Sequence, residues 1–227
     1  MFNRRWDIRL FILSLIVLTF GWQLDLWSSG LFFTESGFQL GDALPFVVIY
    51  EVFGFLPYLL VPGLLATALW LFWRYRNGRD PFKRKIFIFL FVSLVVGPGL
   101  LVNTVFKNNS IGRARPSQVV EFGGENQFTP AFVYSGACET NCSFVSGHAS
   151  MGFYFIALGW LMRSRRWFWI GLGIGSLVGL TRIVQGGHFL SDTVFAFWSV
   201  YWVNVGLGYW LGLPSPFSTT PQPQTSR

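Results

Sequence analysis

The stretch IFIFLFVSLVVGPGLLVNTVF, residues 86–106, contains no charged side chain. A transmembrane helix needs about 20 mostly apolar residues, so this stretch predicts a membrane span. The basic run Lys83-Arg84-Lys85 comes directly before it, and Lys107 comes directly after it. Of the 227 residues, 52% are hydrophobic and only 12% are charged, against about 25% in soluble domains. We therefore expect an integral membrane protein, and the composition excludes a soluble or disordered chain.

Five more apolar segments accompany this one, and the six predict an all-α bundle of transmembrane helices within one domain, residues 1–213. The first apolar run follows basic residues, as in a signal peptide, but no convincing cleavage site follows, so we interpret it as a retained span. Residues 31–54 are apolar but broken by acidic residues, and this segment could lie flat at the membrane surface. Residues 214–227, rich in Pro, Ser, Thr and Gln, predict a disordered cytoplasmic tail. The six spans are expected at about 10–27, 55–73, 86–106, 147–162, 167–184 and 193–213.

Most of the 17 basic residues lie before the first span, between the second and third, or between the fourth and fifth. The positive-inside rule makes these segments cytoplasmic and puts both termini inside. The net charge of +7 is thus explained by topology, and no nucleic-acid partner is expected. Four basic residues fall on the predicted outer side instead: Lys107, Arg113, Arg115 and Arg182.

Both histidines of the chain lie at the same predicted outer boundary. One belongs to the pattern Arg182-x5-His188-x3-Asp192, in which the histidine and aspartate would be neighbours on a helix. A carboxylate bonded to one ring nitrogen fixes the tautomer, which leaves the other nitrogen as a nucleophile or base. This pattern therefore predicts a reactive His188.

The second histidine lies in Ser146-Gly147-His148, which opens the fourth predicted span. Ser is a good N-cap, and helix N-termini bind anions. The helix dipole would lower the pKa of His148 and a bound phosphate would raise it, and the sequence leaves open which effect is larger. The nearby Lys107, Arg113 and Arg115 add cations that suit a dianionic phosphate.

Taken in order, these motifs resemble those of the type 2 phosphatidic acid phosphatase (PAP2) superfamily, which also contains vanadium haloperoxidases. The resemblance implies that His188 is the nucleophile that becomes phosphohistidine and that Asp192 orients it. It also implies that His148 protonates the leaving oxygen and then activates water. No metal and no cofactor are implied. The phosphate-binding set that we expect is Lys107, Arg113, Arg115, Arg182, Ser146 and Gly147.

The chain departs from the usual PAP2 pattern at three points. Seven residues separate Lys107 from Arg115, where the family usually has six. Val145 stands where the family commonly has Pro, and Thr181 stands where it commonly has Ser.

Residues 141–153 and 185–192 look like bacterial lipid A phosphatases, especially the 4′-phosphatase branch. The expected substrate is therefore a lipid phosphate in the outer leaflet of the cytoplasmic (inner) membrane, hydrolysed at the periplasmic boundary. Undecaprenyl diphosphate and phosphatidylglycerophosphate are alternative substrates. A lipid phosphotransferase on the same scaffold, or a lipid transporter or binding protein without turnover, are alternative functions.

The two cysteines, Cys138 and Cys142, lie in the outer loop between the third and fourth spans. An oxidising compartment permits a short disulfide between them, which would stiffen the loop before the phosphate site. Two reduced or separately buried thiols are the alternative.

Overall fold

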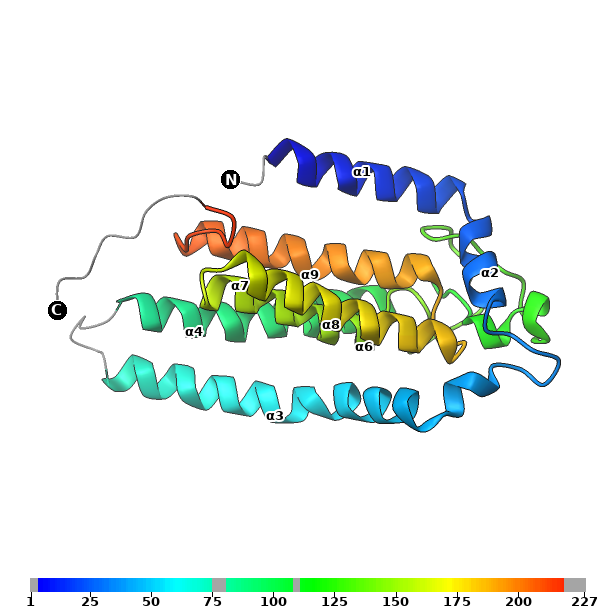
Figure 1. Cartoon of the computed structure of the whole chain (residues 1–227), viewed down its shortest axis with the longest axis horizontal. Coiled ribbons are helices and arrows are strands. Elements are labelled where there is room, and N and C mark those ends of the chain that lie inside the picture. The colour runs from blue at the N-terminus through cyan, green and yellow to red at the C-terminus, as the bar shows by residue number, and fades with distance from the viewer. Residues whose placement is uncertain (1–3, 75–80, 108–110, 219–227) are drawn as a thin grey trace.

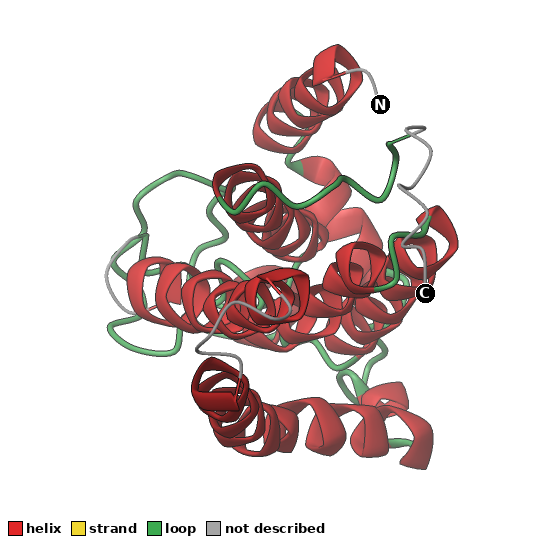
Figure 2. Cartoon of the chain, turned by 90° about the vertical axis from the view of Figure 1, so that its left-hand side faces the viewer, coloured by secondary structure: helices red, strands yellow, loops and turns green. Residues whose placement is uncertain are grey.

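The computed structural model describes residues 4–74, 81–107 and 111–218, and every named element among them is helical. The long helices run along one axis as an elongated bundle, with α1 and α3 at opposite edges (Figure 1, Figure 2). The elements are α1 (Arg4–Phe20), α2 (Gln23–Gly30), the 3-10 turn η1 (Gln39–Asp42), α3 (Leu44–Arg74), α4 (Pro81–Leu94), the π-helix η2 (Val95–Phe106), the 3-10 turns η3 (Pro116–Gln118) and η4 (Val120–Phe122), α6 (Gly147–Phe153), the 3-10 turn η5 (Tyr154–Ala157), α7 (Leu158–Leu161), α8 (Arg165–Val184) and α9 (Leu190–Trp210).

Three helices in the described residues are long and apolar enough to cross a membrane: α3, the joined α4 and η2, and α8. The bent pair α1 and α2 raises the number to four if it counts as one span. Helix α9 has 21 residues, but its Trp, Tyr and Asn residues reduce its hydropathy. The predicted fourth span consists of three short consecutive helices, α6, η5 and α7. The all-helical membrane class is confirmed, whereas six clear spans are not seen.

The predicted first span, 10–27, is two helices rather than one. Helix α1 ends at Phe20, and α2 leaves it at an angle of 80°. A Cβ atom on Gly21 would lie 2.5 Å from the Val17 carbonyl oxygen, so the glycine is what permits this turn. As a result α2 lies across the far end of the bundle instead of continuing along it (Figure 1).

The second predicted span, 55–73, begins earlier than expected. Helix α3 starts at Leu44 and has 31 residues, which is about 46 Å of helix against a hydrocarbon core of about 30 Å. Residues 44–54 therefore continue the helix and do not form a separate surface segment. None of the most apolar stretch of α3 is buried within the protein, so its side chains are available to lipid.

The core lies where α6, η5, α8 and α9 pack together. Glycines on α8 let these backbones approach closely, as small residues do between membrane helices. A Cβ on Gly171 would lie 2.3 Å from the backbone of Phe155, and a Cβ on Gly152 would lie 2.9 Å from the Cα of Gly175. This tight packing fixes the start of α6 relative to the end of α8.

The predicted disordered tail, 214–227, begins with an ordered segment. Phe217 is only 6% exposed, and its ring lies 4.9 Å from that of Phe168. The start of the tail therefore packs on α8. Residues 219–227 lie outside the described residues.

Candidate active site

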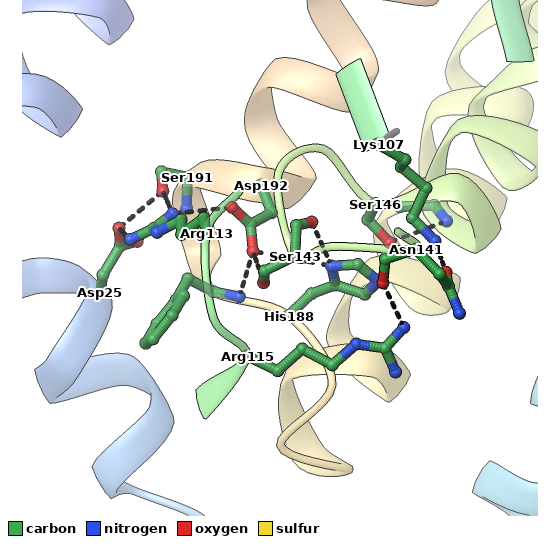
Figure 3. A network of polar contacts seen from close by, with 12 residues as sticks. Asp25, Lys107, Arg113, Arg115, Asn141, Ser143, Ser146, His188, Ser191 and Asp192 are labelled. Atoms are coloured by element: carbon green, nitrogen blue, oxygen red, sulfur yellow. Dashed lines mark hydrogen bonds and ion pairs between the residues drawn. The ribbon is translucent and has the colours of Figure 1, made fainter. Parts of the chain in front are cut away.

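His188 is the centre of a polar cluster at the end of the bundle that carries α2 (Figure 3). Its ring is buried, and its Nδ1 lies 2.7 Å from the carbonyl oxygen of Ser143. A carbonyl only accepts, so Nδ1 carries the hydrogen and Nε2 keeps its lone pair. Asp192 Oδ2 lies 3.6 Å from Nδ1, which is too long for a hydrogen bond. The expected proximity of the two residues is seen, but a carbonyl and not the carboxylate fixes the tautomer.

Asp192 is fully buried, and its oxygens are held from several sides. Oδ1 accepts a bond of 2.7 Å from Arg113, while Oδ2 accepts bonds from the Ser143 hydroxyl at 2.5 Å and the Phe189 N–H at 2.8 Å. The carboxylate thus fixes the loop whose carbonyl orients His188. Its influence on the ring is both positional and electrostatic.

His188 and Asp192 do not lie on one helix, which corrects the expectation from their spacing. Helix α8 ends at Val184, Gly186 adopts a φ of +61°, and the N–H groups of the next two residues both bond to the Arg182 carbonyl. Helix α9 starts at Leu190, so its third residue, Asp192, reaches back to an N–H before the helix. A helix end, a glycine turn and a helix start therefore bring these side chains together.

Arg182 and the second histidine meet across an aromatic ring. The guanidinium of Arg182 lies 4.6 Å from the ring centroid of Tyr50, which stacks on His148 at 4.4 Å. One terminal nitrogen of Arg182 bonds to the Gln185 side chain, while its buried Nε has no partner among the described residues. That Nε–H is therefore a buried donor without a partner in the described part of the chain.

Ser146 caps helix α6, as its sequence predicts. Its buried hydroxyl accepts a bond of 3.3 Å from the Ala149 N–H, and its own N–H bonds to the Asp192 carbonyl. A Cβ on Gly147 would lie 2.6 Å from Asn103 Oδ1 and 3.6 Å from Lys107 Nζ. Glycine at this position lets the start of the helix pack against the lysine.

Lys107 and Arg115 converge on one residue, Asn141 (Figure 3). The Lys107 ammonium donates to Asn141 Oδ1 at 2.6 Å, and Arg115 donates to the Asn141 carbonyl at 2.9 Å. Lys107 is thus brought to the site despite the seven-residue gap, of which residues 108–110 lie outside the described part. Burial, assisted by the charges of Arg115 and Arg182, lowers the pKa of Lys107 to about 8.

Cys138 and Cys142 are joined by a disulfide, and Asn141 lies inside the short ring that it closes. Asn141 has a φ of +54°, in the left-handed region that Asn tolerates better than most residues. The backbone N–H of Cys142 also bonds to the Lys107 carbonyl. The disulfide therefore restrains the residue on which both cations depend.

Arg113 does not point into the phosphate site, and this corrects our expectation. It is fully buried, and its three nitrogens bond to Asp192, Asp25, Ser191 and the carbonyl of Thr129. The bonds to the two carboxylates have lengths of 2.7 and 2.8 Å. Arg113 thus lies behind Asp192, on the side away from His188.

A scan against protein families matches the PAP2 superfamily over residues 86–213. The chain belongs to the PAP2 superfamily. A lipid A 4′-phosphatase of Francisella tularensis subsp. novicida is 39% identical over 218 residues, which cover 87% of this chain and 95% of that protein. A lipid A 4′-phosphatase of Rhizobium leguminosarum is 32% identical over 78% of this chain and 82% of its own length. A lipid A 1-phosphatase of Rhizobium etli is 36% identical over 47% of this chain and 42% of its own length, and no solved structure matches.

A cavity of about 740 Å³ extends from this PAP2 site along α3, α4 and η2. Lys107, Asn141, Gly147 and His148 line its polar end, and the rest of the lining is mainly apolar. Its apolar lining is Phe53, Gly54, Pro57, Tyr58, Val61, Leu94, Val95, Pro98, Gly99, Leu100 and Met151. Within the described residues, no group of three or more His, Cys, Asp or Glu side chains is placed to hold a metal ion.

Sequence reasoning missed four residues of the site. Tyr50 was hidden in a stretch whose helix could not be recognised, and Asn141 and Ser143 have ordinary side chains in a loop. Asp25 had a usable signal, because a carboxylate within an apolar segment must find a partner. Nothing in the sequence named that partner as Arg113.

Activity should fall at alkaline pH because Lys107 loses its charge. Its pKa of about 8 means that the ammonium is present below pH 8 and lost above it. We expect kcat/KM, which reports the free enzyme, to decline with an apparent pKa of about 8. In Lys107→Arg the cation persists, so the decline should move to higher pH. An unchanged alkaline limb in that variant would exclude Lys107 as its source.

Reduction of the disulfide should weaken the site through Asn141. We expect reductant, or the double variant Cys138→Ser/Cys142→Ser, to lower kcat/KM by about 10- to 100-fold, the cost typical of small misplacement. The double variant should not respond to reductant. Asn141→Ala should produce a similar loss, and reduction should add little to it. Full additivity of the two losses would mean that the disulfide acts elsewhere.

Proposed function

We propose that this protein is a lipid A 4′-phosphatase of a bacterial inner membrane and that it acts through a phosphohistidine on His188. The observation that carries the mechanism is the fixed Nδ1–H tautomer, which leaves Nε2 as the nucleophile. Burial, opposed by Asp192, lowers the pKa of His188 to about 3, so the ring is neutral at physiological pH. The substrate assignment is supported by the two 4′-phosphatase relatives described above.

In the proposed first step, Nε2 of His188 bonds to phosphorus and the bond from phosphorus to the sugar oxygen breaks. Burial, assisted by the charges of Arg182 and Lys107, lowers the pKa of His148 to about 3, and a dianionic phosphate beside the ring raises it again. In the proposed complex the protonated His148 donates its proton to that oxygen, and the lipid leaves as an alcohol. In the second step, His148 takes a proton from water, the water oxygen bonds to phosphorus, and the N–P bond breaks. Lys107, Arg115 and the free Nε–H of Arg182 stabilise the phosphoryl oxygens. Ser146 and Gly147 complete the proposed cradle at the start of α6.

The apolar cavity supports a lipid as the substrate. Phe53, Pro57, Val61, Leu94 and Leu100 line it along the direction of the helices, and its polar end is the candidate site. A phosphate at that end would leave an acyl chain room beside α3, whose most apolar stretch is not buried within the protein. A water-soluble phosphate ester would leave this surface unused.

We also propose six spans within residues 1–213, with both termini cytoplasmic and the site periplasmic. The junction of α7 and α8 lies at the end of the bundle opposite to α2 (Figure 1), and it carries Arg163 in the turn and Arg165 and Arg166 at the start of α8. An impermeant thiol reagent applied to intact cells tests this. Gln127→Cys should react from outside and Ser164→Cys should not, and the reverse pattern would place the site in the cytoplasm.

The substrate is tested with the purified protein and a panel of lipids. We expect free phosphate from lipid A, with mass spectrometry locating the loss at the 4′ position and not at the 1 position. Undecaprenyl diphosphate, phosphatidylglycerophosphate and phosphatidic acid should be poorer substrates by kcat/KM. Preference for one of these would overturn the assignment. Product formation only when a second lipid is added, without free phosphate, would indicate a phosphotransferase.

A further inference from the structure

A buried chain of charges continues behind the candidate nucleophile (Figure 3). Asp192 bonds to Arg113 at 2.7 Å, and Arg113 bonds to Asp25 at 2.8 Å. The three side chains are 0%, 0% and 1% exposed. Asp25 comes from α2, the short helix that turns across the end of the bundle. Asp25, which lies 166 positions before Ser191 in the chain, thus bonds to the residues behind the candidate nucleophile.

Asp25 is fixed as firmly as Asp192. Oδ1 accepts a bond of 2.8 Å from the Ser191 N–H, and Oδ2 accepts bonds from the Ser191 hydroxyl at 2.6 Å and from Arg113. The guanidinium also lies 4.2 Å from the ring centroid of Phe189. Buried ions are costly unless they are paired and fully bonded, and here each one is. A guanidinium held in this way has one position from which to contact Asp192.

We propose that Arg113 and Asp25 are positioning residues of the phosphatase reaction, which act on His188 through Asp192. Arg113 attracts and orients the carboxylate, and Asp25 both anchors the guanidinium and offsets its charge. During the attack on phosphorus the ring of His188 gains a positive charge. The Asp192 carboxylate beside it is then held in one position and stays ionised. The proposal rests on His188 being the nucleophile of the proposed function.

The charges that face His188 set the direction of each expected change. Asp192 of α9 raises its proton affinity, while Arg182 of α8 and Lys107 after η2 lower it. His148 of α6 is the other titratable group that interacts with the ring. Removing the positive charge of Arg113 makes the surroundings more negative and raises the affinity of the ring for a proton. Removing the negative charge of Asp25 has the opposite sign. A role confined to holding the fold would give no such pair of opposite shifts.

The chain has only two histidines, so ¹⁵N-histidine labelling yields the ring nitrogen signals of two residues only. We would titrate the protein in nanodiscs by NMR and assign the signals with His148→Gln. The protonation midpoint of His188 should rise by about one pH unit or more in Arg113→Gln. It should not rise in Asp25→Asn, and it should return toward wild type in the double variant, whose net charge is restored.

Activity provides the second measurement. Arg113→Gln should lower kcat by roughly 10- to 100-fold, with little change in KM. This is the loss that typically follows when a residue that orients a functional side chain from behind is removed, as measured in metal sites. Arg113→Lys keeps the charge and should keep the wild-type titration. Glu35→Gln removes an exposed carboxylate in the loop after α2 and should change neither quantity.

Equal midpoints in wild type, Arg113→Gln and the double variant would overturn the proposal, even if all variants lost activity. The titration uses no substrate, so it remains informative if lipid A proves to be the wrong lipid. If His188→Gln retained turnover, the proposed mechanism would fail instead. The two failures are therefore distinguishable.

Discussion

His188→Gln is expected to lower kcat by about 10⁵-fold, because removing a nucleophile leaves only the catalysis that binding and electrostatics supply. The glutamine amide cannot form the bond to phosphorus that we assign to Nε2. The measurement is single-turnover phosphate release from lipid A, with folding checked by the melting temperature. Wild type quenched in alkaline denaturant should also contain a phosphoryl group that is stable in alkali and lost in acid, and the variant should lack it.

His148→Gln is the matched control for this loss. It should also be slow on lipid A, because the sugar alcohol needs a proton to leave. A substrate with an acidic leaving group, such as an aryl phosphate on a lipid chain, needs no such proton. The first step of His148→Gln should therefore recover with the aryl substrate, whereas His188→Gln should not. Recovery of both variants would remove His188 from the nucleophile's role.

Asp192→Asn is expected to lower kcat by about 10³-fold, the scale of losing one preorganised electrostatic partner. The carboxylate accepts bonds from Arg113, Ser143 and the Phe189 N–H. An amide cannot accept all of these, because one of its two ends donates. The ring of His188 would also develop its positive charge without a neighbouring anion.

The kinetic signature separates this loss from weak substrate binding. KM should change little, because Asp192 lies behind the histidine and away from the cavity lining. Asp192→Glu keeps the charge and should recover part of kcat. An Asp192→Asn variant within 10-fold of wild type would mean that the carboxylate serves the fold alone.

The sequence predicted that His188, Asp192 and Arg182 lie close together, and their roles in the reaction stay predictions. His188, Asp192 and Arg182 needed only the right offsets, and the Ser146 cap needed only a local helix start. Arg113 was misassigned because two arginines in one short run have the same chemistry, and only tertiary contacts separate them. Their different environments arise from α2, which is far away in the chain.

The helices show the same division between local and distant causes. Apolar length placed α8 within two residues of its predicted span, 167–184, because lipid exposure acts on each residue locally. The turn after α1 depends on Gly21 and on what α2 finds at the end of the bundle, so hydropathy could not reveal it. The extension of α3 to Leu44 was hidden because acidic residues interrupt an otherwise apolar stretch.

The 80° turn at Gly21 brings α2, which lies outside the region that matches the family, to the end of the bundle that holds the candidate site. The matched region, 86–213, contains every motif side chain, yet Asp25 lies outside it. A fragment trimmed to residues 86–213 would keep all the motif residues but would lose Asp25, the carboxylate that pairs with Arg113. In a fusion protein or a natural truncation, α2 and the turn that carries it therefore belong with the catalytic part of the protein in our proposal, because α2 supplies Asp25.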